Sequence, residues 1–308
     1  LPRGTPSGGS DCVAPFWRRA AQNTPARATI VWVLDVSGSN NRVPLGTDPH
    51  RSYAAQIQYV VRACLALRAV NTTLPVHVLA SGLRVPSVEA RLPELGVKVL
   101  APASVPPPRV ASWASKWART SFAKLRVLTL GDLFDTVVLL DTDVVALRNV
   151  DDLALHPAPA FVLGWKCFPR RELKAAVAVL RPEPGAWQRA LALVDDPEAG
   201  VYDDLGEQSV WRRLYASVHE LPAGYAALRS ADFSAAEWRH VHVLHDPNLL
   251  RKAGRDGWKE ASMADVVKRL DVATQRETSR RTGGLPRRLM PLLDTATAKR
   301  VATLGRTE

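Results

Sequence analysis

The feature that most constrains this chain is a short apolar segment that ends abruptly in two carboxylates. Residues Thr136 to Leu140 read Thr-Val-Val-Leu-Leu, and Asp141-Thr142-Asp143 follows directly. An apolar run without polar alternation is typical of a strand that is covered on both faces. Ligands of open α/β sheets bind beyond the carboxyl ends of such strands, where residues i and i+2 point the same way. Asp141 and Asp143 are therefore predicted to face one hard cation, Mg²⁺ or Mn²⁺, although a polar turn after the strand is the simpler alternative.

Strands and helices alternate along the chain on either side of this motif. Apolar runs predict strands over residues 28–34, 75–80 and 97–100 before it, and over residues 160–164, 175–180 and 241–244 after it. Helical stripes are expected over residues 53–67 and 113–128, after Pro184 and after Asp204. This order predicts an α/β fold in a single domain, with a mixed, mainly parallel sheet flanked by helices.

The chain of 308 residues is long enough for one large α/β domain or two small ones. We expect a flexible N-terminal arm over residues 1–27, the folded domain over residues 28–258 and a basic, helical extension over residues 259–308. No run of about 20 apolar residues occurs, so the sequence predicts no membrane-spanning helix. A targeting segment ahead of Leu1 is left open, and with the glycosylation sequon at Asn71 it favours a secretory compartment such as the Golgi lumen over the cytoplasm.

The net charge of +11 favours an anionic substrate or surface as the partner. Nucleic acid is not the expected partner, because the basic residues are spread along most of the chain and lack zinc-finger spacing, RNA-binding aromatic pairs and heptads after a basic block. Cys12, Cys64 and Cys167 are odd in number and far apart, which fits neither a disulfide framework nor a zinc site. We leave open whether the chain forms a homodimer.

The stretch over residues 122–147 reads Lys-Leu, a helix, the apolar strand and then Asp-Thr-Asp with a Val-rich continuation. It resembles the glycogenin-like (family 8) glycosyltransferases. The resemblance covers roughly residues 28–258 and continues in the same order through shorter blocks at residues 149–153, 175–182, 206–209, 221–225 and 243–245. It implies a GT-A (Rossmann-like) fold and a retaining transferase that moves a hexose or related sugar from a UDP-sugar donor to a glycan, lipid or protein acceptor, with Mn²⁺ or Mg²⁺ as cofactor.

The resemblance also implies roles for individual residues. Asp141, Asp143 and His245 would hold the metal, which bridges the donor diphosphate and offsets charge on the departing UDP. Lys124 would contact the donor phosphate or sugar, and the pair Glu207-Gln208 would lie near the anomeric carbon. The other donor contacts that it implies are those of Val33, Leu34, Tyr53, Thr142, Arg251 and Lys252.

Three of these assignments have alternatives in the residues themselves. His242 competes with His245 for the metal, because strand alternation puts the two side chains on opposite faces. Lys124 lies on a stripe that should be buried and could extend its ammonium to water instead of into the site. The sequence Asp204-x-x-Glu207 at a helix start reads equally as a capping box, in which Glu207 bonds the backbone.

Three departures from the family pattern bear on activity. Lys174 and Ala176 stand in place of the family's Asn and Gly, and Glu207 in place of its Asp. They leave the sugar open and make a nucleotide-sugar-binding GT-A protein without turnover the first alternative function. The second is a haloacid dehalogenase-type phosphatase, with Asp141 as nucleophile and Asp143 beside it. The position of the motif argues against that class, because its motif opens the domain whereas strand–helix units precede this one.

Overall fold

The computed structural model describes residues 27–35, 49–81, 85–100, 121–163, 173–196, 206–228 and 240–245. Their centre is a seven-stranded sheet with the strand order β3-β2-β1-β4-β7-β6-β8. Its strands are β1 (Ala28–Asp35), β2 (Val76–Ser81), β3 (Val97–Leu100), β4 (Thr136–Leu140), β6 (Ala160–Leu163), β7 (Leu173–Leu180) and β8 (His219–Leu221). The expected N-terminal arm, apart from Arg27, and the expected C-terminal extension lie outside the described residues.

The sheet is mixed and mainly parallel. β1 runs parallel to β2 and β4, and β2 runs parallel to β3. β7 is antiparallel to both of its neighbours, β4 and β6, whereas β6 and β8 are parallel to each other. The predicted fold class, a mixed and mainly parallel sheet flanked by helices, is confirmed, and β7 is the strand that reverses direction within the described part of this sheet.

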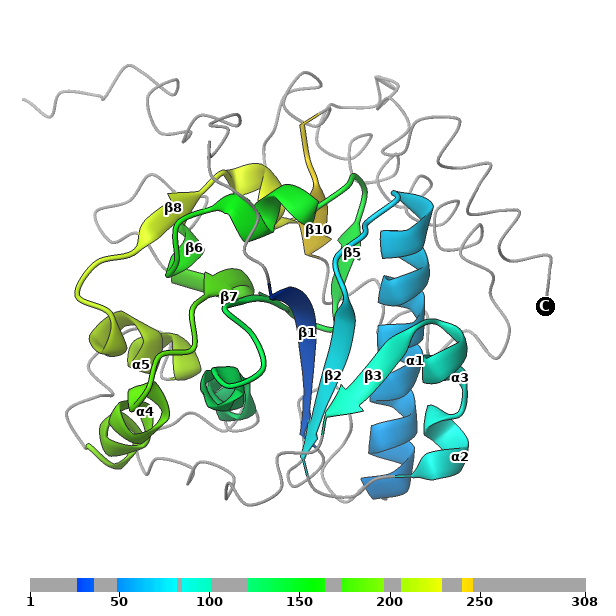
Figure 1. The fold of residues 1–308 in the computed structure, drawn as a ribbon, viewed down its shortest axis with the longest axis horizontal. Helices are drawn as coiled ribbons and strands as arrows, with labels where there is room; N and C mark the ends of the chain where they lie inside the picture. Colours follow the sequence, from blue (N-terminus) through cyan, green and yellow to red (C-terminus); the bar gives the residue numbers. More distant parts are fainter. Residues whose placement is uncertain are drawn as a thin grey trace, which may run out of the picture.

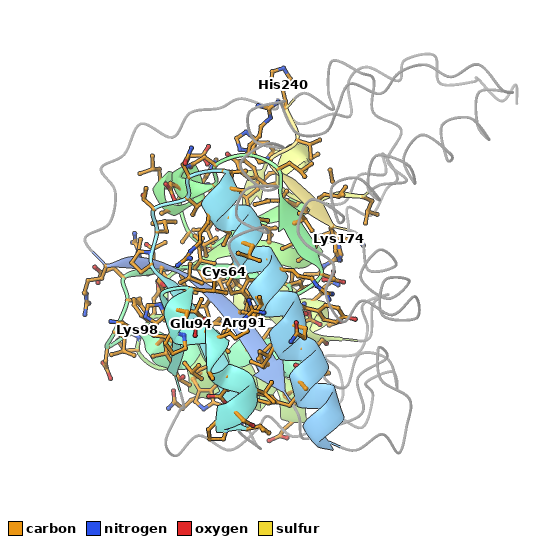
Figure 2. The ribbon with its side chains drawn as sticks, turned by 90° about the vertical axis from the view of Figure 1, so that its right-hand side faces the viewer. Cys64, Arg91, Glu94, Lys98, Lys174 and His240 are labelled. Atoms are coloured by element: carbon orange, nitrogen blue, oxygen red, sulfur yellow. The ribbon has the colours of Figure 1, made fainter. Side chains whose placement is uncertain are left out.

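Helices cover both faces of the sheet (Figure 1). On one face lie α1 (Pro49–Ala69), α2 (Pro86–Glu89) and α3 (Arg91–Glu94), which stand in front of the sheet in Figure 2. On the other face lie η1 (Ser121–Leu130), α4 (Ala186–Asp195) and α5 (Glu207–Leu214). Of the helix expected over residues 113–128, the described part belongs to η1, a 3₁₀ helix. Within the described ranges no helix combines the length and apolarity that crossing a bilayer would require.

The central strand β4 is covered on both faces, as its uninterrupted apolar sequence predicts. Val137 and Leu139 pack with side chains of η1, α4 and α5, whereas Val138 and Leu140 pack with those of α1. All four side chains are buried. Burial of a side chain of this size contributes about 1.5–3 kcal/mol. The apolar sequence of β4 therefore places this strand between two helical layers. Asp141 follows at the carboxyl end of the strand.

A second, three-stranded sheet has the order β5-β10-β9 and consists of β5 (Val144–Ala146), β9 (Ala227–Leu228) and β10 (Val243–His245). β10 pairs antiparallel with β5 and parallel with β9. Side chains of β5 and β10 join the core that also contains β1 and α1, so the two sheets share one core. The strand expected over residues 241–244 is β10, displaced towards its carboxyl end, and β5, β8 and β9 were not predicted.

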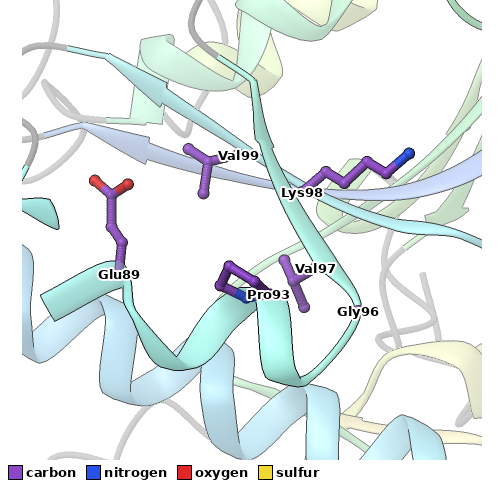
Figure 3. A pocket seen from close by; sticks show the side chains of 6 residues that line it. All are labelled: Glu89, Pro93, Gly96, Val97, Lys98 and Val99. Carbon is purple, nitrogen blue, oxygen red and sulfur yellow. The ribbon is translucent and has the colours of Figure 1, made fainter. Parts of the chain in front are cut away.

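A hollow of about 460 Å³ opens at the β3 edge of the main sheet (Figure 3). At the turn into β3, Gly96 has a φ of +65°, in the left-handed region that glycine adopts without a steric cost. The hollow is lined by Glu89, Pro93, Gly96, Val97, Lys98 and Val99. This set contains none of the site residues that the sequence predicts, so the hollow is separate from the carboxylates at the end of β4.

Candidate metal centre

Pairing between strands of the two sheets assembles the predicted metal residues. At the end of β4, the backbone N–H of Asp141 donates to the carbonyl of Ala176 on β7 at 2.9 Å. A tight turn then leads into β5, and the N–H of Val144 donates back to the carbonyl of Asp141 at 3.3 Å. In the antiparallel pair of β5 with β10, Val144 stands opposite His245. The register therefore places His245 next to the Asp141–Asp143 turn, although about a hundred residues separate them in the chain.

The ligand atoms of Asp141, Asp143 and His245 all lie within 4.8 Å of one another. His245 Nε2 is 3.5 Å from Asp143 Oδ2. Ligands of an octahedral divalent cation bind at about 2.0–2.1 Å and are thus about 3–4 Å apart, so small movements would close this cluster around one ion. Two carboxylates and an imidazole form an oxygen-and-nitrogen donor set of the kind that binds divalent metal ions. The three residues therefore fit a divalent cation.

Lys124 extends from η1 into the same cluster. Its Nζ lies 2.7 Å from Oδ1 and 2.9 Å from Oδ2 of Asp141, and 3.0 Å from Oε1 of Glu207. The side chains of Lys124, Asp141 and Glu207 are 18%, 15% and 4% exposed, so the three charges are largely shielded from water. The sequence left open whether the Lys124 ammonium extends to water or into the site. In the structure it points towards the carboxylates.

Electrostatics in this cluster reflect burial and the density of charge. Burial opposes the charge on Lys124, but the carboxylates of Asp141 and Glu207 outweigh it and raise the pKa of Lys124 above its ordinary value. Burial also raises the pKa of Asp141; Lys124 opposes this shift and the nearby Asp143 carboxylate adds to it. Two neighbouring carboxylates whose charges are only partly balanced are the environment that a divalent cation would stabilise.

The capping-box reading of Glu207 is wrong. A capping box would make Asp204 the N-cap and Glu207 the third helical residue, whereas α5 begins at Glu207 and its N-cap is Gly206. The carboxylate of Glu207 accepts a hydrogen bond from Lys124 instead. Glu207 is buried, as its place on the apolar face of the helix predicts, and Gln208, the next residue, is half-buried. Asp204 lies outside the described residues.

The two candidate histidines have different surroundings. His245 belongs to the three-residue cluster, whereas His242 Nδ1 lies 2.9 Å from the carbonyl oxygen of Asn149 and its ring packs on Tyr225. The hydroxyl of Tyr225 in turn donates to Asp152. This contact joins two of the sequence blocks that carry the family resemblance, residues 149–153 and 221–225, and it braces the chain next to β10. No pattern in the sequence predicts the contact between Tyr225 and Asp152.

The structure does not gather all the predicted donor residues around the cluster. Leu34 and Tyr53 are fully buried in the core, and the Tyr53 hydroxyl donates to Glu89 at 2.5 Å. Val33, the next residue to Leu34 on β1, is half-buried on the opposite face of the sheet. Thr142 lies between the two aspartates and is buried. The predicted donor contacts of residues 251 and 252 fall outside the described residues.

No family model and no curated protein sequence matches this chain. Among solved structures it is similar to the glycosyltransferase GlyE of Streptococcus pneumoniae TIGR4, with 16% identity over 84% of this chain and 66% of that one and a TM-score of 0.49. It is also similar to the galactosyltransferase LgtC in complex with donor and acceptor sugar analogues (17% identity, 71% of this chain and 87% of that one, TM-score 0.43). A third similar structure is that of the mouse xyloside xylosyltransferase 1, with 12% identity over 71% of this chain and 97% of that one and a TM-score of 0.44. All three of these proteins are glycosyltransferases.

Proposed function

We propose that this chain is a Mn²⁺-dependent glycosyltransferase that moves a hexose or related sugar from a UDP-sugar to an acceptor with retention of configuration. The observation that carries the proposal is the meeting of Asp141, Asp143 and His245 at the carboxyl end of β4. Metal-binding groups at that edge of an open α/β sheet lie where ligands of such folds bind. The ordered sequence blocks that resemble the glycogenin-like transferases support the same class.

In this proposal Asp141, Asp143 and His245 hold the metal. Bound there, a divalent cation would act as a Lewis acid that offsets negative charge on the departing UDP. The backbone bond from Asp141 to Ala176 fixes the first carboxylate at the end of β4, and the pairing of Val144 with His245 fixes the imidazole. The burial of Asp143 limits the water that could compete for its oxygens.

The remaining roles concern the donor. Lys124 offers an ammonium at the edge of the cluster that can bond a phosphate or sugar oxygen. Gln208 follows Glu207 at the start of α5 and is assigned to the anomeric carbon. Val33 and the backbone of Leu34 are assigned to the nucleotide, as are Thr142, Arg251 and Lys252, whereas Tyr53 is buried in the core and bonds Glu89, so it takes no part in this proposal.

The test is UDP release from a panel of UDP-sugars, with Mn²⁺ or with a chelator, by the wild type and by Asp143→Ala. We expect metal-dependent release from one sugar and its loss in the variant, because Asp143 supplies a ligand. The control is UDP binding measured by calorimetry under the same conditions. UDP binding through the metal without release, even with candidate acceptors, would favour a binding protein without turnover. Absence of metal-dependent UDP binding by the wild type would refute the proposal, and a phosphatase assay would then test Asp141 as a nucleophile.

A further inference from the structure

The ammonium of Lys124 forms an ion pair with the carboxylate of Asp141, which the proposed metal site also needs as a ligand. Its Nζ lies 2.7 Å from one oxygen of Asp141 and 2.9 Å from the other, so the whole carboxylate faces the ammonium. Asp141 is also one of the three residues whose ligand atoms lie within 4.8 Å of one another. A divalent cation and the ammonium would have to share this carboxylate, and two cations that close together repel each other.

Glu207 offers the ammonium a second partner. Its Oε1 lies 3.0 Å from Nζ of Lys124, and its side chain is only 4% exposed. Among the described residues, the cluster that could hold a metal consists of Asp141, Asp143 and His245, so Glu207 stands beside it. Lys124 is itself largely buried, and a buried charge that loses its partner is strongly destabilising. Because Glu207 remains, Lys124 can give up Asp141 without being left as an unpaired buried charge.

We infer that Lys124 and Glu207 together set the metal affinity of this site. Lys124 holds Asp141 in the metal-free protein, and Glu207 retains the ammonium when a divalent cation takes its place at Asp141. The inference rests on the metal site of the proposed function and goes beyond it, because it makes Lys124 a competitor of the metal. Glu207 is a positioning residue in this scheme: it acts on the metal through Lys124.

The experiment is a double-mutant cycle read out by Mn²⁺ binding without any donor. MnCl₂ is titrated into the wild type, Lys124→Met, Glu207→Gln and the double variant, and free Mn²⁺ is followed by its electron paramagnetic resonance signal. Removing a charged hydrogen-bond partner should change binding by about tenfold or more. We expect Lys124→Met to bind Mn²⁺ more tightly than the wild type. We expect Glu207→Gln to bind it more weakly, because the ammonium then depends on Asp141 alone.

The decisive comparison is between Lys124→Met and the double variant. If Glu207 acts through Lys124, its replacement changes nothing once the ammonium is gone, and the two variants bind Mn²⁺ alike. If Glu207 instead attracts the metal directly by its charge, Glu207→Gln weakens binding by the same factor in both backgrounds. That additive result overturns the inference, as does a Lys124→Met variant that binds no more tightly than the wild type.

Failure of the inference and failure of the metal site have different signatures. An additive cycle together with loss of Mn²⁺ binding in Asp143→Ala overturns the inference and leaves the metal site intact. Absence of Mn²⁺ binding in the wild type and in all variants overturns both.

Lys124→Met leaves Glu207 buried without a cation and could fail to fold, so the wild type supplies a second measurement. Crystal structures would be determined with and without MnCl₂. With Mn²⁺ bound, we expect Lys124 Nζ to lie beyond hydrogen-bond distance of both Asp141 oxygens while it keeps its 3.0 Å bond to Glu207. An ammonium that stays on both oxygens of Asp141 beside a bound Mn²⁺ would overturn the inference.

Discussion

At the scale of single residues, the imidazoles of His242, just before β10, and His245, at its end, have two different roles. His245 Nε2 lies 3.5 Å from Asp143, whereas the ring of His242 lies 4.8 Å from that of Tyr225 and bonds the Asn149 carbonyl. The two residues are close in sequence but point to different neighbours. The choice between them was open in the sequence, because alternation shows that they differ in direction but not which of the two faces the aspartates.

This difference predicts unequal effects of two matched substitutions. His245→Ala should weaken Mn²⁺ binding by at least about tenfold, because it removes a nitrogen ligand. His242→Ala should leave Mn²⁺ affinity nearly unchanged, because His242 supplies no ligand atom to the cluster. Binding is measured by the resonance signal of free Mn²⁺, with circular dichroism as the check on folding. Equal losses in the two variants would mean that the position of β10, rather than the His245 imidazole, determines binding.

Cys64 gives a second prediction at this scale. It lies on α1 (Figure 2), it is buried, and its Sγ is 3.8 Å from the carbonyl of Leu95. Burial raises the pKa of the thiol to about 11, so the reactive thiolate is scarce at neutral pH. In a variant with Cys12 and Cys167 replaced by Ser, a thiol reagent at pH 8 should label Cys64 only after unfolding in denaturant. Rapid labelling of the native variant would contradict this environment.

Which site residues could be predicted depends on how far apart the interacting residues lie along the sequence. Asp141 and Asp143 could be predicted because two carboxylates at the end of an apolar strand form a local pattern. The bond between Lys124 and Glu207 joins residues that are 83 positions apart, and nothing local encodes it. Glu207 instead showed a local pattern typical of a helix cap, and that pattern proved misleading because α5 begins later than expected.

At the scale of elements, the pairing of β5 with β10 decides where the site forms. Both strands are three residues long, too short to show a period in the sequence. α1, by contrast, has 21 residues and a clear apolar stripe, and its position was predicted. Short strands are specified by their partners rather than by their own sequence, which is why β5, β8 and β9 were not predicted while the longer strands of the main sheet were.

Hydrogen bonds between Asp151 and the segment before β2, called here the Asp151 clamp, lead to a prediction about stability. The Asp151 carboxylate, at the start of η2 (Asp151–Leu155), accepts hydrogen bonds from the backbone N–H of Thr73 at 2.9 Å, from its hydroxyl at 2.9 Å and from the N–H of Leu74 at 3.1 Å. Asp151→Ala should lower the free energy of unfolding by about 0.5–1.5 kcal/mol, because it removes several hydrogen bonds whose exposed donors can then bond water. Urea denaturation measures the loss.

The matched control for this clamp is the exposed Asp195 at the end of α4. Asp195→Ala should change stability by less than about 0.5 kcal/mol, as exposed substitutions usually do. Mn²⁺ affinity should stay the same in both variants, because neither carboxylate belongs to the metal cluster. Equal stability of the two variants would show that solvent replaces the Asp151 bonds at no cost.

At the scale of the whole molecule, the order of strands and helices was predictable because each long element carries its own periodic pattern. The reversal of β7 was not specified in the sequence, since a strand buried on both faces reads the same in either direction. That reversal matters for the site, because the carbonyl of Ala176 on β7 receives the N–H of Asp141. The fold class therefore followed from local patterns, whereas the arrangement around the carboxylates followed from long-range pairing.

Global stability should also respond to pH through His77, a buried residue on β2. Its Nδ1 lies 2.7 Å from the Thr29 hydroxyl, its ring packs on Phe134, and Lys98 stands opposite it on β3. Burial, with a smaller effect of Lys98, lowers the pKa of His77 below its ordinary value of 6.5. The folded chain therefore binds this proton less tightly than the unfolded chain does. Unfolding becomes more favourable as the pH falls below 6.5, and the effect levels off below the folded pKa.

His77→Gln removes this titration while it keeps a side chain that can hydrogen-bond the Thr29 hydroxyl. Urea unfolding midpoints are compared for the wild type and His77→Gln at pH 7.5 and pH 5.5, so that any constant cost of the substitution cancels. The wild type should lose more stability between these two pH values than the variant does. Part of the loss should remain in the variant, because burial also lowers the pKa of His156. An identical loss in both proteins would mean that His77 takes up its proton equally well in the folded and unfolded states.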